Sequence, residues 1–250
     1  MPTGHRWCLQ SIPCRGRYGS LMDADLSQAP GESQGRTDAV TELLGAIGYA
    51  ELTAGLRMAA DALGAPGLGV RVWMGRASSA ELEHFERIVT RLKELGQDPE
   101  TVMEPFIAPV DAFHERTRPR DWLEALVKIY VGDGIARDFY REIAQHVDEA
   151  SRQLIESVLQ VDDQDEFVVG AVTDAIEADP TVGGRLALWA RRLVGEAIAQ
   201  TQYVAVEREA LMTMMVGGQQ AGVDLADLGR MFTRLIELHG ERMGRLGLTP

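Results

Sequence analysis

Apolar residues recur every three or four positions along most of the chain, beginning near Asp38, and this spacing is typical of amphipathic helices. No segment shows the alternation of apolar and polar residues that predicts a half-buried strand. We therefore expect an all-helical fold. The predicted long helices cover residues 38–63, 68–95, 121–147, 149–177, 181–216 and 224–246, and a short helix covers residues 110–115.

Glycine, proline and capping residues separate these helices. Gly96 is a favoured residue just past a helix end, and Asp121 with Glu124 has the spacing of an N-terminal capping box. Pro180 suits the first turn of the next helix, and residues 97–120, with four prolines, form a long connection. Two long helices, a crossover and two more long helices predict a four-helix bundle with one long connection. The two additional C-terminal helices would pack outside this bundle or form the contact of a homodimer.

The formal net charge of −13 limits the classes of partner. An acidic surface repels phosphate backbones and anionic membranes, so we expect no generic nucleic-acid binding. No apolar run approaches the about 20 residues that a membrane-spanning helix needs. These features predict a protein that acts on neither DNA nor a membrane.

Both cysteines, Cys8 and Cys14, lie in the N-terminal segment. No disulfide therefore holds the helical part together, which fits the reducing cytoplasm. Residues 1–36 are rich in Gly, Pro, Ser and Arg and lack the apolar core of a signal peptide. We expect them to form a disordered tail, with residues 37–250 as the helical domain.

A glutamate and a histidine share one face of the second predicted helix, because Glu81 and His84 are three residues apart. This motif also occurs by chance on charged helices, where it is simply solvated. Glu51 favours a metal site over a solvated face, since it interrupts the apolar face of the first helix. An ionised group there is costly unless it is paired or metal-bound. A Glu on one helix with Glu-x-x-His on its neighbour is half of a carboxylate-bridged di-metal site. Such donors suit iron or manganese.

The second half of such a site is incomplete in this sequence. Asp133 lies among apolar residues of the third predicted helix and is the natural third carboxylate. The fourth helix should then carry acid-x-x-His, but Val161 and Gln164 stand at those positions. Asp165 follows Val161 by one turn on the same face and is a candidate replacement.

Several short stretches are similar to a known family: Tyr49-Ala50-Glu51, Ala80 to Phe85, Tyr130 to Gly134, Asp138-Phe139-Tyr140, and Arg185 to Trp189 with Gly195-Glu196. Over about residues 38–215 the chain resembles the tRNA hydroxylases that act on 2-methylthio-N6-isopentenyladenosine, and more closely their actinobacterial-type ferritin-like relatives.

The resemblance implies a ferritin-like fold and a non-haem di-iron centre that activates oxygen. Glu51, Glu81 and His84 match the first-half ligands of that family. Asp133 matches the carboxylate of the third helix, and Tyr49 would lie near the oxygen-binding pocket.

Three states of the site remain open. One iron ion could bind to Glu51, Glu81, His84 and Asp133, or Asp165 could complete the set. Without metal, the carboxyls must protonate or pair with arginine, because like charges so close raise pKa values. The first state predicts an iron hydroxylase acting on an unknown small molecule or nucleoside. The last predicts a catalytically inactive ferritin-like scaffold or binding protein.

Other polar residues carry weaker signals. Glu196, Gln200 and Tyr203 form a polar stripe on the fifth long helix, which we interpret as a seam of hydrogen bonds between helices rather than as support for metal ligands. Three isolated histidines are expected on the surface: His114, His146 and His239.

Overall fold

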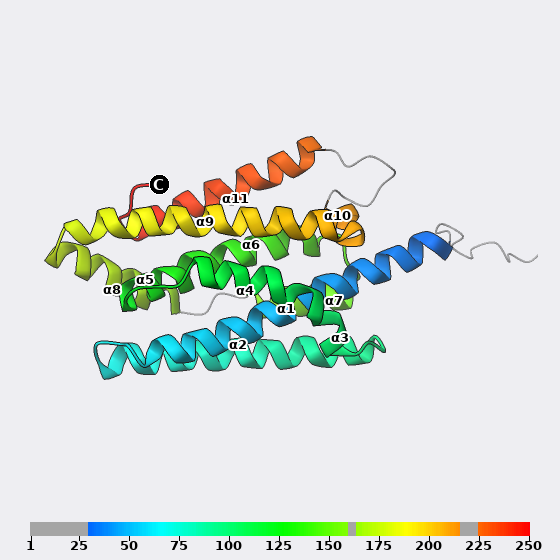
Figure 1. The fold of residues 1–250 in the computed structure, drawn as a ribbon, viewed down its shortest axis with the longest axis horizontal. Helices are drawn as coiled ribbons and strands as arrows, with labels where there is room; N and C mark the ends of the chain where they lie inside the picture. Colours follow the sequence, from blue (N-terminus) through cyan, green and yellow to red (C-terminus); the bar gives the residue numbers. More distant parts are fainter. Residues whose placement is uncertain (1–29, 160–163, 216–224) are drawn as a thin grey trace, which may run out of the picture.

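The computed structural model describes residues 30–159, 164–215 and 225–250, and these residues form helices without a strand. The prediction of an all-helical bundle is thereby confirmed (Figure 1). The helices are α1 (Pro30–Ala62), α2 (Leu68–Glu94), α3 (Pro99–Met103), η1 (Glu104–Phe106), α4 (Ile107–Arg116), α5 (Trp122–Val127), η2 (Lys128–Gly132), α6 (Asp133–Ala144), α7 (Glu149–Val158), α8 (Gln164–Ala178), α9 (Thr181–Glu207), α10 (Glu209–Met215) and α11 (Leu225–Arg245).

Helices α1 and α2 lie side by side as an antiparallel hairpin (Figure 1). α1 begins at Pro30, inside the segment expected to be a tail, while residues 1–29 lie outside the described part of the chain. Gly96 follows α2 with a φ of +72°, a left-handed conformation that favours glycine. The glycine expected to end the second helix therefore does so.

The third predicted helix is present but not uniform. Asp121 caps it by accepting a hydrogen bond from the Glu124 backbone N–H at 2.9 Å, as the capping box predicts. The chain then runs through α5, one turn of π-helix (η2) and α6. A π-turn inserts one extra residue into a helix and changes which side chains face inward. Helical periodicity alone does not reveal it.

Two other predicted helices are divided. The segment expected as one helix over residues 149–177 is α7 and α8, with residues 160–163 between them outside the described residues. α9 ends at Glu207, because Arg208 leaves the helical conformation with φ −127° and ψ 86°, and α10 follows. α11 packs against α6 and α9 on the outside of the bundle, one of the two arrangements expected for it (Figure 1).

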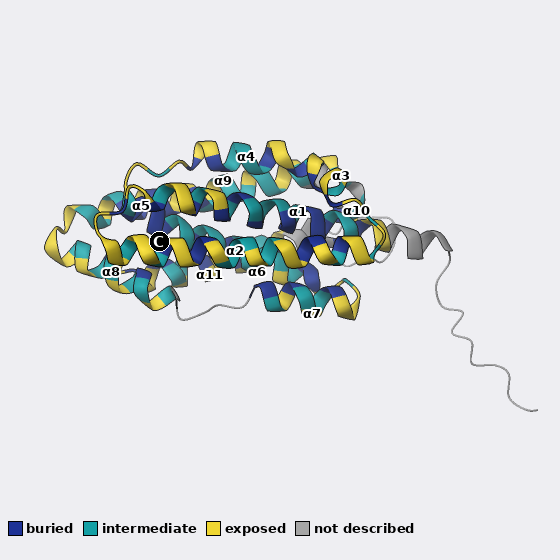
Figure 2. Cartoon of the chain, turned by 90° about the horizontal axis from the view of Figure 1, so that it is seen from below, coloured by how far each residue is buried: buried dark blue, intermediate teal, exposed yellow. Residues whose placement is uncertain are grey.

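The apolar core has two parts, which leave a gap along α1. One cluster includes Leu43, Leu44 and Ile47, and the other includes Ala62 near the opposite end of the helix. Buried residues line the inward faces of the long helices and exposed residues their outer faces (Figure 2). None of the described helices is long and apolar enough to cross a membrane. The gap between the two clusters is where α1 carries its buried glutamate.

Candidate metal centre

Glu51 lies in this gap and is 8% exposed. Gly48 lies three residues before Glu51, and Gly55 lies four residues after it. Glu51 and the two glycines therefore share one face of α1. A Cβ at position 48 would lie 3.1 Å from Ile88 Cγ2, and one at position 55 would lie 2.9 Å from Leu82 Cγ. The glycines therefore allow α1 to approach α2 closely on both sides of Glu51.

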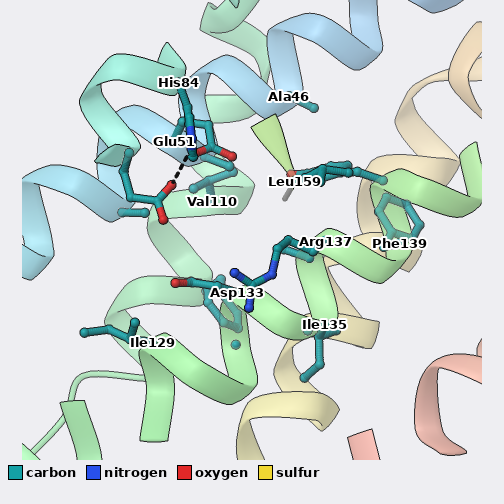
Figure 3. Close-up of a pocket in the computed structure, with 18 of the residues that line it drawn as sticks. Ala46, Glu51, His84, Val110, Ile129, Asp133, Ile135, Arg137, Phe139 and Leu159 are labelled. Atoms are coloured by element: carbon teal, nitrogen blue, oxygen red, sulfur yellow. Dashed lines mark hydrogen bonds and ion pairs between the residues drawn. The ribbon is translucent and has the colours of Figure 1, made fainter. Parts of the chain in front are cut away.

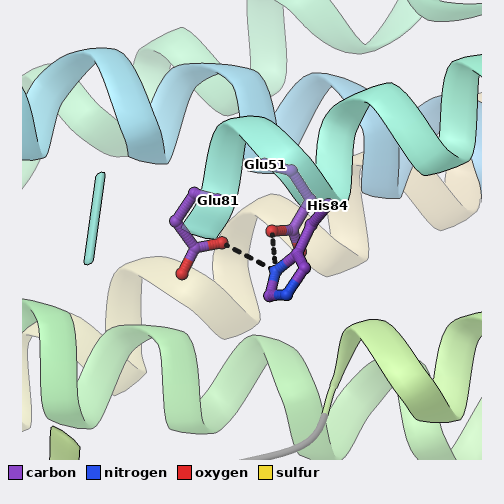
Figure 4. Close-up of side chains that lie close together, drawn as sticks. All are labelled: Glu51, Glu81 and His84. Atoms are coloured by element: carbon purple, nitrogen blue, oxygen red, sulfur yellow. Dashed lines mark hydrogen bonds and ion pairs between the residues drawn. The ribbon is translucent and has the colours of Figure 1, made fainter. Parts of the chain in front are cut away.

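This close approach brings Glu51 to the Glu81 and His84 side chains of α2. His84 Nδ1 lies 3.3 Å from Glu51 Oε2 and 3.6 Å from Glu81 Oε2 (Figure 4). One ligand atom from each of the three residues lies within 4.8 Å of the others. The structure thus brings together the first three residues predicted from the sequence.

The side chains of Glu51 and Glu81 form a hydrogen bond with each other. Burial raises the pKa of Glu51 well above its ordinary value, and the hydrogen bond and charge of Glu81 raise it further. Burial also acts to raise the pKa of Glu81, but its hydrogen bonds with Glu51 and His84 outweigh that effect and leave its pKa lowered. The pKa values of the two glutamates are therefore shifted in opposite directions, so Glu51 is the weaker acid of the pair.

Asp133 is the first residue of α6, directly after the π-turn, and it lines the same cavity. Burial and the charge of Glu81 raise its pKa well above the ordinary value, while Arg137 and Lys128 oppose this effect. Asp133 lies across the cavity from Glu51 and His84 (Figure 3). It does not belong to the group of donors that meet within 4.8 Å in the described part of the chain.

Asp165 also lines the cavity, from the first turn of α8, and its charge contributes to the raised pKa of Asp133. Of the two positions where the fourth helix lacks the expected ligands, Val161 lies outside the described residues. Gln164 begins α8. Asp165 is therefore the acid that α8 offers to the cavity.

Tyr49 lies elsewhere than expected. Its hydroxyl donates a hydrogen bond to Asp111 Oδ2 at 3.3 Å, and it is not one of the residues that line the cavity. Tyr140 of α6 lines the cavity instead, and burial followed by the charge of Glu51 raises its pKa. Asp133, Arg137 and Tyr140 follow one another at spacings of four and three, so the sequence did carry a signal for Tyr140.

The cavity has a volume of about 240 Å³ and mainly apolar walls. α1, α2, α4, η2, α6 and α9 contribute most of its lining, and η1, α7, α8 and α10 add the remaining residues. α9, expected to pack outside the bundle, therefore takes part in its centre. The cavity places a small apolar space directly beside the Glu51, Glu81 and His84 cluster.

Comparison with known families is decisive for the fold. A family model described as a ferritin-like domain of actinomycetes matches residues 35–218. The chain belongs to this ferritin-like family. The matched segment contains every candidate ligand and ends before α11. A search among curated proteins finds no match.

The donor set of this ferritin-like domain fits a metal ion. Carboxylate oxygens and an imidazole nitrogen suit iron, manganese or zinc. Glu51 and Glu81 also hydrogen-bond with each other, and a divalent cation between them would displace the proton of that bond. The three residues at the cavity wall therefore form a chemically suitable site for at least one ion.

Two of the histidines expected on the surface are buried. His114 is 8% exposed, and burial lowers its pKa to about 3; His239 is 3% exposed, and burial lowers its pKa to about 4. The expectation was wrong for both, because α4 and α11 pack these faces against other helices. His146 is exposed, as expected.

The polar stripe on α9 forms the seam that its pattern indicated. Arg116 of α4 lies 3.5 Å from Glu196 Oε2. The Gln200 amide is oriented so that both its NH₂ group and its oxygen form hydrogen bonds. The NH₂ group donates to the Pro109 carbonyl at 3.2 Å, and the oxygen accepts from Arg116 at 2.9 Å. Tyr203, by contrast, is 56% exposed. Glu196 and Gln200 therefore hold α4 against α9 and so close one wall of the cavity.

Proposed function

We propose that this ferritin-like protein binds a divalent transition-metal ion at Glu51, Glu81 and His84, with iron as the expected ion. We further propose that it catalyses oxygen-dependent hydroxylation of a small, mainly apolar substrate. The observation that carries this proposal is the meeting of three donor atoms within 4.8 Å at the wall of a mainly apolar cavity. A bound metal beside an apolar pocket is the arrangement expected of a small-molecule site.

Each residue has a distinct task in this proposal. Iron, when bound, supplies the activation of oxygen that the family resemblance implies. Glu51 and Glu81 contribute negative charge, and His84 contributes a neutral nitrogen. Tyr140 holds a proton at its hydroxyl beside Glu51, because its raised pKa keeps it protonated at neutral pH. The apolar walls exclude water from the reacting atoms.

The substrate class follows from the cavity. Its volume of about 240 Å³ is below the ~300–1,000 Å³ of pockets for drug-sized ligands. We therefore favour a small apolar molecule, or the apolar side chain of a modified nucleoside, over a whole tRNA. Hydroxylation would consume one O₂ and two electrons from an external reductant. One oxygen atom would enter a C–H bond, and the other would leave as water.

Metal content tests this proposal directly. Protein purified from iron-supplemented cells should contain about one ion per chain by elemental analysis, as expected of one set of hard donors. The Glu81→Ala variant should lose most of it. Glu83→Ala is the matched control, since Glu83 is exposed on the same helix. Metal-free wild-type protein, or equal metal content in both variants, would contradict the proposed site.

A second candidate function is a catalytically inactive scaffold, and one observation favours it. Arg137 lines the cavity, and its positive charge acts to lower the pKa of Glu51, Glu81 and Asp133. A protein can balance buried carboxyls in this way without any metal. Stable, fully folded wild-type protein that takes up no iron, manganese or zinc would support this second function.

A further inference from the structure

Arg137 occupies a position in the cavity that the proposed function does not yet use. It lies one turn after Asp133 on α6, and both residues line the cavity. The side chain of Arg137 extends toward Asp133, on the side of the cavity opposite Glu51 and His84 (Figure 3). A cation of the protein thus lies among the acidic residues that line the cavity.

The electrostatics agree with this placement. The charge of Arg137 acts to lower the pKa of all three nearby carboxyls, Glu51, Glu81 and Asp133. Among the residues that the structure describes, Arg137 forms no hydrogen bond or ion pair. Arg141, one turn later, differs because it pairs with Asp138 at 3.2 Å. Arg137 therefore acts as a central charge rather than as one half of a fixed ion pair.

The formal charges around the cavity limit how many ions fit. Four carboxyls line it, and two side-chain cations, Arg137 and Lys128, face them. With all carboxyls ionised, this set has a formal charge of −2, which one divalent ion neutralises. A second divalent ion would leave an excess of two positive charges in a mainly apolar space, which is strongly unfavourable.

We propose that Arg137 takes the place of a second metal ion, so that the site holds one divalent ion beside a guanidinium group. This inference rests on the proposed function, because it requires that Glu51, Glu81 and His84 bind the first ion. In this arrangement, Arg137 supplies a positive charge near Asp133 without pairing with it. It excludes a second ion by charge repulsion.

The test counts bound manganese ions in purified full-length protein. Wild-type protein should bind about one Mn²⁺ per chain, and Arg137→Glu should bind about two, because the exchange removes a cation and adds a hard donor. Arg137→Lys keeps the charge and should still bind one. Arg76→Glu makes the same charge reversal at an exposed position of α2 and should also leave one. Electron paramagnetic resonance would detect magnetic coupling between two adjacent Mn²⁺ ions in Arg137→Glu.

Affinity gives a second readout that does not depend on the count. Arg137→Gln should tighten binding of the first ion by about tenfold or more, because it removes a nearby positive charge. The role of Arg137 would be overturned if wild-type protein bound two ions. It would also be overturned if Arg137→Glu bound one ion and Arg137→Gln bound the first ion with unchanged affinity. Either result would leave the proposed metal site intact. No ion in wild-type protein would overturn the proposed function itself.

Discussion

His84 Nδ1 lies 3.3 Å from Glu51 Oε2, although the two residues belong to different helices and are 33 positions apart. The contact exists because α1 and α2 meet closely at Gly48 and Gly55. It joins a nitrogen donor to the most buried carboxyl of the cluster. The stability of the protein and the proposed metal binding therefore depend on the same few atoms.

Glu51→Gln should stabilise the metal-free protein and abolish metal binding. The raised pKa of Glu51 means that ionising this buried group opposes folding, so its contribution to stability decreases as pH rises above the ordinary value of 4.5. Glutamine removes that cost, because its side chain does not ionise. Thermal unfolding in the presence of a chelator should show a larger gain at pH 7 than at pH 5. Equal stability of the variant and wild type at pH 7 would contradict an unfavourable effect of burying an ionisable group at position 51, and Glu83→Gln serves as the exposed control.

Gly55→Ala should destabilise the protein and weaken metal binding. The new Cβ would lie 2.9 Å from Leu82 Cγ and 3.1 Å from the Ser78 carbonyl oxygen, so α1 and α2 must move apart. We expect a loss of about 1–3 kcal/mol. Gly75→Ala on α2 is the matched control, since nothing lies within 4 Å of its Cβ. That variant should gain about 0.5–1 kcal/mol, and chemical denaturation measures both. A Gly55→Ala variant as stable as wild type would rule out the close approach.

His239→Leu should reduce the acid sensitivity of the fold. Burial lowers the pKa of His239 to about 4, with the charge of Arg242 adding to the effect, so the folded protein holds this group neutral. The unfolded chain binds the proton at a pKa near 6.5. Stability therefore falls as pH decreases from about 6.5 to 4, by up to roughly 1.4 kcal/mol per pH unit. Unfolding measured across this range should show a shallower slope for His239→Leu than for wild type. His146→Gln, at an exposed position, should keep the wild-type slope.

Arg242→Met should loosen α11 from α6. Arg242 pairs with Asp138, whose side chain is 5% exposed, and the change leaves that carboxylate with Arg141 as its remaining partner. Removing one partner of a buried ion pair lowers the free energy of unfolding by about 3–5 kcal/mol. The remaining contact with Arg141 should reduce this loss. Arg245→Ala breaks the exposed pair with Glu166 and should cost less than about 1 kcal/mol. Hydrogen exchange of α11 would show faster opening in Arg242→Met alone, and equal exchange in both variants would contradict the docking role of Asp138.

The sequence was sufficient for much of the fold and for half of the site. Apolar periodicity and capping residues such as Asp121 and Gly96 predicted the helices, because both act locally along the chain. Glu51, Glu81 and His84 were also predictable. A charged residue on an apolar helix face and an i, i+3 pair on the neighbouring helix can both be recognised from the sequence alone.

Other parts could not be found in this way. The π-turn before Asp133 leaves no mark on the hydrophobic pattern, and it changes the face that α6 presents to the cavity. Arg137 was not recognised as a site residue, since an arginine on a helix usually faces solvent. Tyr49 was predicted to lie near the pocket, but it is two positions from Glu51, and residues two apart on a helix do not face each other. Tyr140 was not recognised as a site residue.

The sequence by itself determined that this protein is a helical bundle with an acidic surface and a Glu-Glu-His set on its first two long helices. Local propensity and periodicity are sufficient for those conclusions. Only the tertiary structure decided that the three side chains meet beside an apolar cavity and that Arg137 faces them from α6. Such convergence depends on how closely helices approach and how each is rotated about its axis, and packing across the whole bundle sets both.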